Sequence, residues 1–194
     1  MNGQGLKMRV DGLEKKRQEL DFYPTTPECV TALLNSGYGP SKLLGPVWEP
    51  AVGKGHISHE LNKAGFRTIH SDIKDYGEVE DVSVQSFLDC PVLRADQIVT
   101  NPPYDIADDF IRHALSLKPA YLALLLKADY FSKKKALSIF NYALPGRVRR
   151  PSAIMPLTWR PDFLGQGKPF LTVQWVVWDE DYQSHPITKL LAKP

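Results

Sequence analysis

Cysteine is scarce in this sequence, in which Cys29 and Cys90 are the only two. They lie far apart and lack the short spacing of zinc ligands, so neither a disulfide scaffold nor a zinc site is expected. His56, His59 and Glu60 share a helical face but match neither H-E-x-x-H nor H-x-x-E-H. We therefore expect no bound metal and a reducing compartment.

Long hydrophobic runs are also lacking. No stretch approaches the roughly 20 consecutive apolar residues that a membrane-spanning helix needs. The N-terminal segment is polar and mixed in charge, unlike a secretory signal. We expect a cytoplasmic protein without membrane partners.

The sequence also lacks a strong excess of one charge, with a net formal charge of +2. That value is too small to indicate nucleic-acid binding by itself. Basic residues cluster at 133–135 and 147–150, and either cluster alone is typical of a solvated surface. Arg147 and Arg149 precede a predicted loop, which makes them candidates for phosphate contacts.

The length and composition predict one domain over residues 1–194, because 43% hydrophobic residues suffice for one core of ordinary size. Residues 1–20 have too few apolar positions to define a helix face and are interpreted as an N-terminal arm. The segment 151–169 is interpreted as a variable loop that can hold a target-recognition segment.

Apolar periodicity and turn residues predict alternating helices and strands. Thr26 followed by Pro27 is typical of a helix start, with the threonine as cap. The order predicts an α/β fold with a mostly parallel sheet and an antiparallel C-terminal strand. The expected helices are 26–36, 56–64, 106–117 and 130–142, and the expected strands are 43–49, 66–70, 96–100, 120–126, a short one near 148, and 170–178.

A glycine turn links the strand ending at Glu49 to the next helix. Glycine permits a left-handed backbone and close approach of a ligand, and a helix start offers free N–H groups. Gly53 and Gly55 match neither the phosphate loop nor the dinucleotide fingerprint. Asp72 ends the following strand, where a carboxylate can accept hydrogen bonds from both hydroxyls of a ribose. Together they favour a nucleoside-like cofactor that is poor in phosphate.

The most specific motif is Asn101-Pro102-Pro103-Tyr104, directly after an apolar strand. An aromatic amino group is a poor nucleophile because its lone pair is delocalised into the ring. The Asn101 side-chain oxygen and the Pro102 carbonyl can accept both amino hydrogens and aim the lone pair at a methyl donor. Rigid prolines hold those acceptors in place, and Tyr104 provides a face for stacking an extruded base.

These blocks, in this order, resemble S-adenosylmethionine-dependent, amino-group-specific DNA methyltransferases, especially small phage-type adenine N6 methyltransferases. The resemblance implies a Rossmann-like class I methyltransferase fold in a bacterial or phage-infected cell, with Asn101, Pro102, Pro103 and Tyr104 as catalytic residues. It implies that S-adenosylmethionine is bound by Tyr23, Thr26, Pro27, Glu49, Pro50, Gly53, Gly55, Asp72 and Phe87.

The tail of the sequence, from Trp159 to Asp179, is similar to the tail of the same phage-type proteins. In the wider class an aromatic residue of this later loop packs against the target base, so Trp159 and Phe163 are candidate substrate contacts. One position departs from the family pattern, since Ser86 stands where an aspartate usually contacts the cofactor's adenine.

The expected reaction is direct transfer of a methyl group to the N6 amino group of adenine in DNA, with the base extruded from the helix. No cysteine lies in a nucleophile context, so no covalent enzyme intermediate is expected. Two alternatives stay open. The substrate can instead be RNA, at guanine N2 or adenine N6, or a protein glutamine. The chain can also be a catalytically silent nucleic-acid-binding domain of the same fold.

Overall fold

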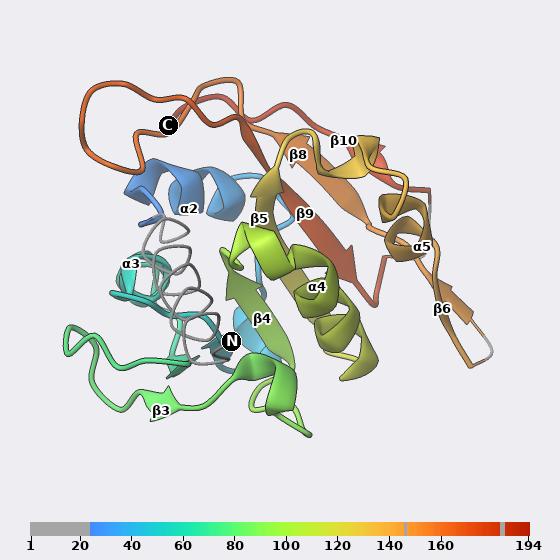
Figure 1. Cartoon of the computed structure of the whole chain (residues 1–194), viewed down its shortest axis with the longest axis horizontal. Helices are drawn as coiled ribbons and strands as arrows, with labels where there is room; N and C mark the ends of the chain where they lie inside the picture. Colours follow the sequence, from blue (N-terminus) through green and yellow to red (C-terminus); the bar gives the residue numbers. More distant parts are fainter. Residues whose placement is uncertain (1–23, 146, 183–184) are drawn as a thin grey trace, which may run out of the picture.

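Eight strands form one mixed sheet in the computed structural model, which describes residues 24–145, 147–182 and 185–194 (Figure 1). The predicted arm 1–20 and Tyr23 lie outside the described residues. The helices are α2 (Pro27–Leu34), α3 (His56–Lys63), α4 (Ala107–Ser116) and α5 (Ala136–Phe140), and 3₁₀ turns cover Lys42–Leu44, Phe87–Asp89, Tyr104–Ile106 and Tyr130–Ser132. The strands are β1 (Val47–Glu49), β2 (Thr68–Asp72), β3 (Ser83–Val84), β4 (Gln97–Thr100), β5 (Tyr121–Lys127), β6 (Tyr142–Leu144), β7 (Arg147–Arg149), β8 (Ala153–Pro156), β9 (Val173–Asp179) and β10 (Ile187–Thr188).

The strand order in the large sheet is β10-β8-β9-β5-β4-β1-β2-β3. Strands β3, β2, β1, β4 and β5 are parallel neighbours, and β9 runs antiparallel between β5 and β8. This confirms the predicted α/β fold with an antiparallel strand late in the chain. The chain leaves β1 toward β2 on one side and returns to β4 on the other, so the strand order reverses between β1 and β4.

Side chains that alternate along the central strands build a core on each face of the sheet. On one face Val99, Ala123 and Trp175 pack under α2 and α3. On the other face Ile98, Leu122 and Trp178 pack under α4 and α5. Figure 1 shows α4 crossing in front of β4 and β5. Helices on both faces leave the strand ends as the place where a ligand can reach the sheet.

Helix α2 begins where the sequence predicts, with Thr26 at the N-cap and Pro27 in the first turn. The Thr26 side chain makes no capping hydrogen bond and instead lies 3.3 Å from the Cys29 thiol. Trp175 donates from its indole nitrogen to the Cys29 carbonyl at 2.8 Å. These contacts fasten the start of α2 to the sheet beside the carboxyl end of β4.

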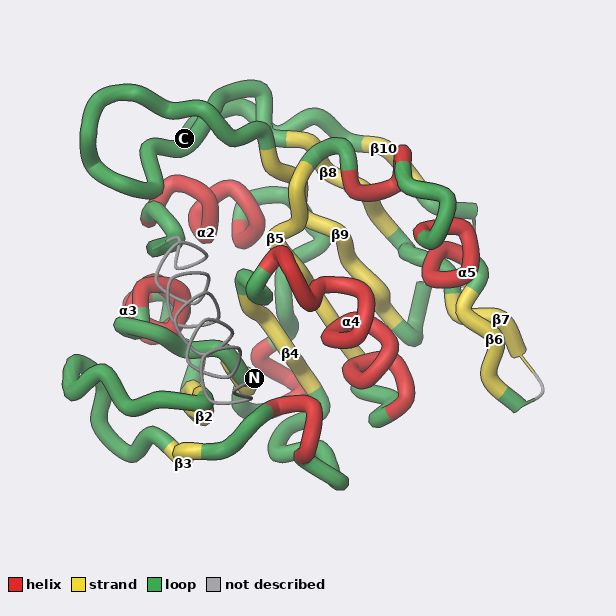
Figure 2. The backbone as a smooth tube through the Cα atoms, in the orientation of Figure 1, coloured by secondary structure: helices red, strands yellow, loops and turns green. Residues whose placement is uncertain are grey.

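Three sequence predictions differ from the structure after β5. The predicted helix 130–142 is a 3₁₀ turn followed by the short α5, since Tyr142–Leu144 pairs with Arg147–Arg149 instead. The predicted strand near Val148 is therefore part of this separate hairpin, which projects beside α5 (Figure 2), and not of the main sheet. The first part of the predicted loop 151–169 is β8, whose small and apolar residues pack against β9.

No helix among the described ranges is both long and apolar enough to cross a bilayer.

We predict that Gln97→Leu destabilises the fold by about 3 kcal/mol, because buried Gln97 bonds the loop before β1 through three hydrogen bonds. Its amide oxygen accepts from the Ser41 backbone N–H at 2.7 Å, and its amide nitrogen donates to the Ser41 and Gly45 carbonyls. The measurement is urea unfolding. Gln174→Leu is the matched control, because buried Gln174 makes one such bond, to Lys127. Equal losses in the two variants would contradict the prediction.

Candidate active site

The carboxyl ends of β1, β2 and β4 bring three predicted site segments to one edge of the sheet. In the parallel register Glu49 pairs with His70, and Trp48 pairs with both Ile69 and Ile98. The glycine turn, Asp72 and the segment that starts at Asn101 therefore leave the sheet side by side. This edge lies at the reversal of strand order, where open α/β sheets bind ligands.

The glycine turn is held by the neighbouring strand β2. Gly53 has φ 53° and Gly55 has φ 78°, a left-handed region that glycine adopts at little cost. The Gly53 N–H donates to an Asp72 carboxylate oxygen at 2.8 Å. A Cβ atom on Gly55 would clash with a methyl group of Val79, so the loop after β2 also packs directly on the turn. The sequence predicts these glycines correctly as a turn but gives no sign of Val79.

Glu49 is buried at the end of β1 and is tied to helix α3. It accepts from the Ser58 backbone N–H at 2.8 Å and from the Ser58 hydroxyl. Since Ser58 is the third residue of α3, the carboxylate satisfies one of the N–H groups that a helix start leaves unpaired. Burial raises the pKa of Glu49 to about 8, although the bonds from Ser58 act in the opposite direction. Glu49 therefore stabilises the start of α3, whether or not it also contacts a ligand.

Asp72 is buried at the end of β2, and both of its oxygens accept backbone N–H groups. The donors are Gly53 at 2.8 Å and Lys74 at 3.2 Å. Burial raises the pKa of the Asp72 carboxyl, and these donors oppose the rise. A carboxylate has about four acceptor positions, and the Ile73 backbone N–H is a further donor, so the remaining acceptor capacity can serve a ribose hydroxyl.

The residues at the cofactor edge suit a cation better than a polyphosphate. The Asp72 carboxylate adds to the rise in the pKa of Glu49, so the two acidic groups lie close enough to repel each other. Lys54, the basic residue of the turn, is paired with Glu78 at 2.6 Å. A sulfonium beside the Asp72 carboxylate would be stabilised, whereas phosphates would be repelled.

The segment from Asn101 to Tyr104 follows β4 and contacts Thr25, which lies just before the start of α2. The Asn101 side-chain nitrogen donates to the Thr25 hydroxyl at 3.2 Å, which fixes the direction of the amide. Thr25 is buried, and the sequence analysis did not single it out. The Lys127 ammonium, at the end of β5, lies 5.0 Å from the centre of the Tyr104 ring. A positive charge therefore lies over one face of this ring, also without a signal in the sequence. Tyr104 itself is buried, with 7% of its surface exposed, and belongs to the core cluster that includes Phe163.

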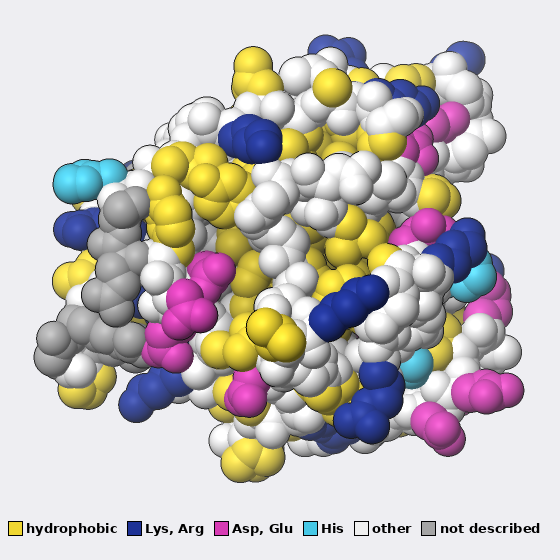
Figure 3. Space-filling model, turned by 180° about the vertical axis from the view of Figure 1, so that it is seen from behind, with side chains coloured by type: hydrophobic (Ala, Val, Ile, Leu, Met, Phe, Trp, Pro, Cys, Tyr) yellow, Lys and Arg dark blue, Asp and Glu magenta, His cyan; other side chains and the backbone are white. Residues whose placement is uncertain are grey.

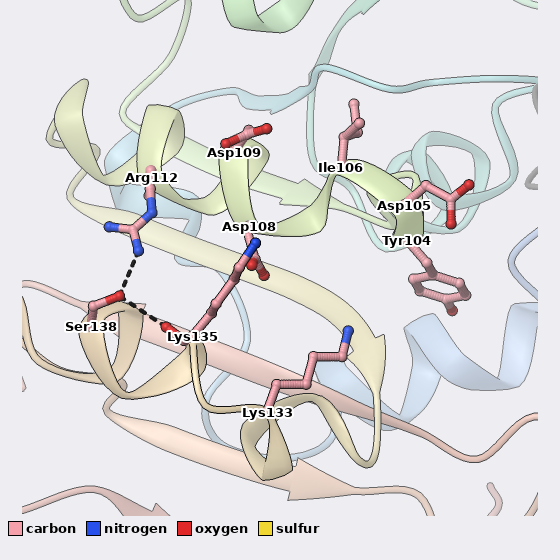
Figure 4. A pocket seen from close by; sticks show the side chains of 9 residues that line it. All are labelled: Tyr104, Asp105, Ile106, Asp108, Asp109, Arg112, Lys133, Lys135 and Ser138. Carbon is pink, nitrogen blue, oxygen red and sulfur yellow. Dashed lines mark hydrogen bonds between the residues drawn. The ribbon is translucent and has the colours of Figure 1, made fainter. Parts of the chain in front are cut away.

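Two cavities flank this edge. One of about 480 Å³ lies beside Tyr104, between the start of α4 and the segment before α5 (Figure 4). The other, of about 430 Å³, lies beside Gly55 and Pro27 and is lined by the start of α3 and the loop after β2. Among the described residues no group of three or more His, Cys, Asp or Glu side chains is placed to hold a metal ion.

The structure does not bring all predicted site residues to this edge. The Phe87 ring packs on Trp48 and Phe110, with ring centres 5.3 and 4.3 Å apart, and exposes 4% of its surface. It is part of the core rather than a side-chain contact for a ligand. Arg149 is also buried, and it donates to the Pro119 carbonyl just before β5, at the amino end of the strand. The structure therefore does not bring this guanidinium to the carboxyl edge of the sheet.

The remaining candidates lie on the hairpin and on the loop between β8 and β9. The backbone of Arg147 belongs to β7, and its side chain is outside the described part. Phe163, predicted as a base contact, is buried in the core next to α2. Trp159 is half-buried against the same core, while Phe170, which the sequence analysis overlooked, exposes 55% of its surface.

Comparison with solved structures identifies the fold. A candidate RNA methyltransferase from Pyrococcus horikoshii superposes with a TM-score of 0.58 at 15% identity, over 78% of this chain and 82% of that one. The fold is that of class I methyltransferases. The modification subunit of a candidate type I restriction enzyme from Vibrio vulnificus superposes with a TM-score of 0.56 at 12% identity, over 94% of this chain. This chain spans about half of that subunit, with 50% of it covered.

A third methyltransferase-fold neighbour has a small-molecule substrate in its name. It is the 1,6-didemethyltoxoflavin-N1-methyltransferase from Burkholderia thailandensis, solved with S-adenosylhomocysteine, with a TM-score of 0.54 and 10% identity over 90% of this chain and 88% of that one. No family model and no curated protein matches the sequence. At these identities the methyltransferase fold is shared, while the named substrates differ.

The free energy of unfolding of the wild type should fall as pH rises, because Glu49 ionises. We predict that the Glu49→Gln variant does not show this fall. The folded pKa of about 8 exceeds the ordinary value of 4.5, so the folded state holds the proton more tightly. Stability is then highest below about pH 4.5 and falls as pH rises toward about 8, by up to ~1.4 kcal/mol per pH unit. Glutamine keeps an oxygen for Ser58 and does not ionise.

The measurement is urea unfolding of both proteins at several pH values between about 5 and 8. The stability of Glu49→Gln relative to the wild type should increase across this interval. Glu80→Gln, at an exposed position, serves as the control and should show no such trend. A difference between wild type and Glu49→Gln that stays constant with pH would refute the assignment.

Proposed function

We propose that this chain transfers a methyl group from S-adenosylmethionine to the N6 amino group of adenine in DNA. The observation that carries the proposal is the position of Asn101-Pro102-Pro103-Tyr104. It follows β4 at the reversal of strand order, beside the glycine turn and Asp72. Methyl transfer of some kind is supported by the class I methyltransferase fold, and the amino-group substrate is supported by the motif.

The cofactor side consists of the glycine turn and the two buried carboxylates. Asp72 holds the ribose, and Gly53 and Gly55 let the methionine portion approach the backbone. Pro50, Thr26 and Pro27 border this space, since Pro50 leads into the turn and α2 begins next to Asn101. When bound, the cofactor supplies an electrophilic methyl group on a positively charged sulfur.

On the substrate side, the chain orients the nucleophile. Asn101 and the Pro102 carbonyl accept the two hydrogens of the adenine amino group, and Thr25 holds the Asn101 amide in place. With the amino lone pair aimed in this way, the amino nitrogen would accept the methyl group, and the leaving thioether would keep the electron pair of the broken carbon–sulfur bond. The nitrogen afterwards releases one proton to water. Catalysis in this scheme is mostly positioning.

The motif alone does not distinguish the competing substrates. RNA and protein substrates would use the same acceptors, Asn101 and Pro102, and would differ from DNA in their contacts around Tyr104. Resemblance of the tail to phage-type adenine methyltransferases supports DNA. A catalytically silent domain would not need to bind a cofactor. The hydrogen bond between Gly53 and Asp72 and the left-handed backbone of both glycines instead favour a cofactor site.

The first test is transfer of labelled methyl groups to unmethylated DNA, followed by nucleoside analysis. We expect label in N6-methyladenine and a loss of at least about a hundredfold in Asn101→Ala, because misplacing the amino group by about 1 Å has that effect. Asn101→Asp is the matched control, because a carboxylate oxygen can also accept a hydrogen bond from the amino group, so this variant should keep more activity than alanine.

Calorimetric titration with S-adenosylmethionine separates the alternatives. Cofactor binding with label only in RNA or protein would overturn the DNA substrate. Absence of cofactor binding would overturn methyl transfer altogether and favour the silent domain.

A further inference from the structure

Apart from Tyr104, the residues that line the cavity beside it have no role in the function proposed above. The cavity has a volume of about 480 Å³, within the range of small-ligand sites. Tyr104 forms one wall, so a group in this cavity would touch the residue on which the target base is proposed to stack. Figure 4 shows α4 on one side and the segment 133–138 on the other. The lining residues are Tyr104, Asp105, Ile106, Asp108, Asp109, Arg112, Lys133, Lys135 and Ser138.

Hydrogen bonds fasten the two walls of this cavity. Tyr130 donates from its hydroxyl to the Asp108 carboxylate at 2.7 Å. Arg112, on α4, donates to the Ser138 hydroxyl on α5. These bonds connect α4 to the segment 130–138 and give the cavity a fixed shape before any ligand arrives.

The charges of the lining point to a ligand with both an anionic part and a hydrogen-bond donor. Three carboxylates and three cationic side chains line the cavity, so neither a polyphosphate nor a hydrocarbon fits well. A nucleotide has one phosphate for the lysines and, in adenine, cytosine or guanine, an exocyclic amino group for a carboxylate.

We infer that this cavity binds the nucleotide that flanks the target adenine in the DNA strand. Lys133 and Lys135 contact its phosphate, and Asp109 accepts from the amino group of its base. The inference rests on the proposed function, because that function places the target base at Tyr104. It assigns the choice of neighbouring base to this cavity rather than to the loop between β8 and β9.

Positive charge leads from the target position into the cavity. The Lys127 ammonium lies over the Tyr104 ring, and the Lys133 ammonium lies 5.3 Å from the centre of the Tyr130 ring. In Figure 4 the Lys133 side chain extends toward Tyr104. Both basic and acidic side chains are also present on the opposite face of the molecule, which Figure 3 shows. What distinguishes the edge around Tyr104 is that its ammonium groups lie beside aromatic rings, an arrangement suited to a nucleic-acid strand.

The first test compares two neighbouring lysines in the full chain. Binding of a single-stranded oligodeoxynucleotide is measured by fluorescence anisotropy at several salt concentrations. Lys133→Gln should reduce the salt dependence of log Kd by about 0.7, the value for one phosphate contact on a single strand. Lys134→Gln removes the same charge from an exposed position outside the cavity and should change the salt dependence of log Kd much less. Equal effects of the two variants would overturn the inference.

The second test uses oligodeoxynucleotides with one adenine and random neighbours. Wild type should methylate them roughly tenfold less well when the flanking base in the cavity is thymine, which lacks an exocyclic amino group. Asp109→Asn should lose this preference, because an amide can accept or donate. Asp129→Asn, at an exposed position outside the cavity, should keep it. An unchanged preference in Asp109→Asn would overturn the base contact.

Failure of the proposed function gives a different result. If wild type binds the oligodeoxynucleotide but transfers no methyl group, the proposed function fails, while the lysine comparison still decides whether the cavity binds DNA. If only an RNA oligonucleotide shows the difference between Lys133→Gln and Lys134→Gln, the assignment of the cavity to DNA is overturned.

Discussion

Two carboxylates buried at the ends of adjacent parallel strands constrain the whole site. Glu49 and Asp72 need hydrogen-bond donors, since burial disfavours their charged forms. Ser58 provides them for Glu49 at the start of α3, and Gly53 provides one for Asp72. These bonds fix both ends of the glycine turn. The position of the turn, the start of α3 and the end of β2 therefore depend on the same pair of acidic groups.

Much of the fold could be predicted because its elements follow from local patterns. Apolar strands that end at Glu49, Asp72 and Asn101, each followed by a turn, imply parallel pairing with a common carboxyl edge. The region after β5 was harder to predict. Residues 130–142 have apolar positions at helical spacing, but pairing of Tyr142 with Arg149 ends the helix early. Such pairing depends on residues distant in sequence, which periodicity does not report.

The candidate site shows the same division between local and distant information. The motif at Asn101 and the acidic Asp72 were predicted from residues that are adjacent to strand ends. Arg149 was predicted from a basic cluster before a predicted loop and Phe163 from the resemblance of the later loop, and the structure buries both. Thr25 and Lys127 were missed because their contacts with Asn101 and Tyr104 join segments that lie apart in the sequence.

The distribution of charge around Asn101 gives the site two sides. Toward β1 and β2 the buried groups are Glu49 and Asp72, and the lysine of the turn is paired with Glu78. Toward β5 the Lys127 ammonium lies over the ring of Tyr104, and three cationic and three acidic side chains line the adjoining cavity. Under the proposed function, the cationic methyl donor lies on the first side, and lysines on the second side are available for a phosphate of the strand. That proposal places the amino group between the two sides, in line with the methyl donor.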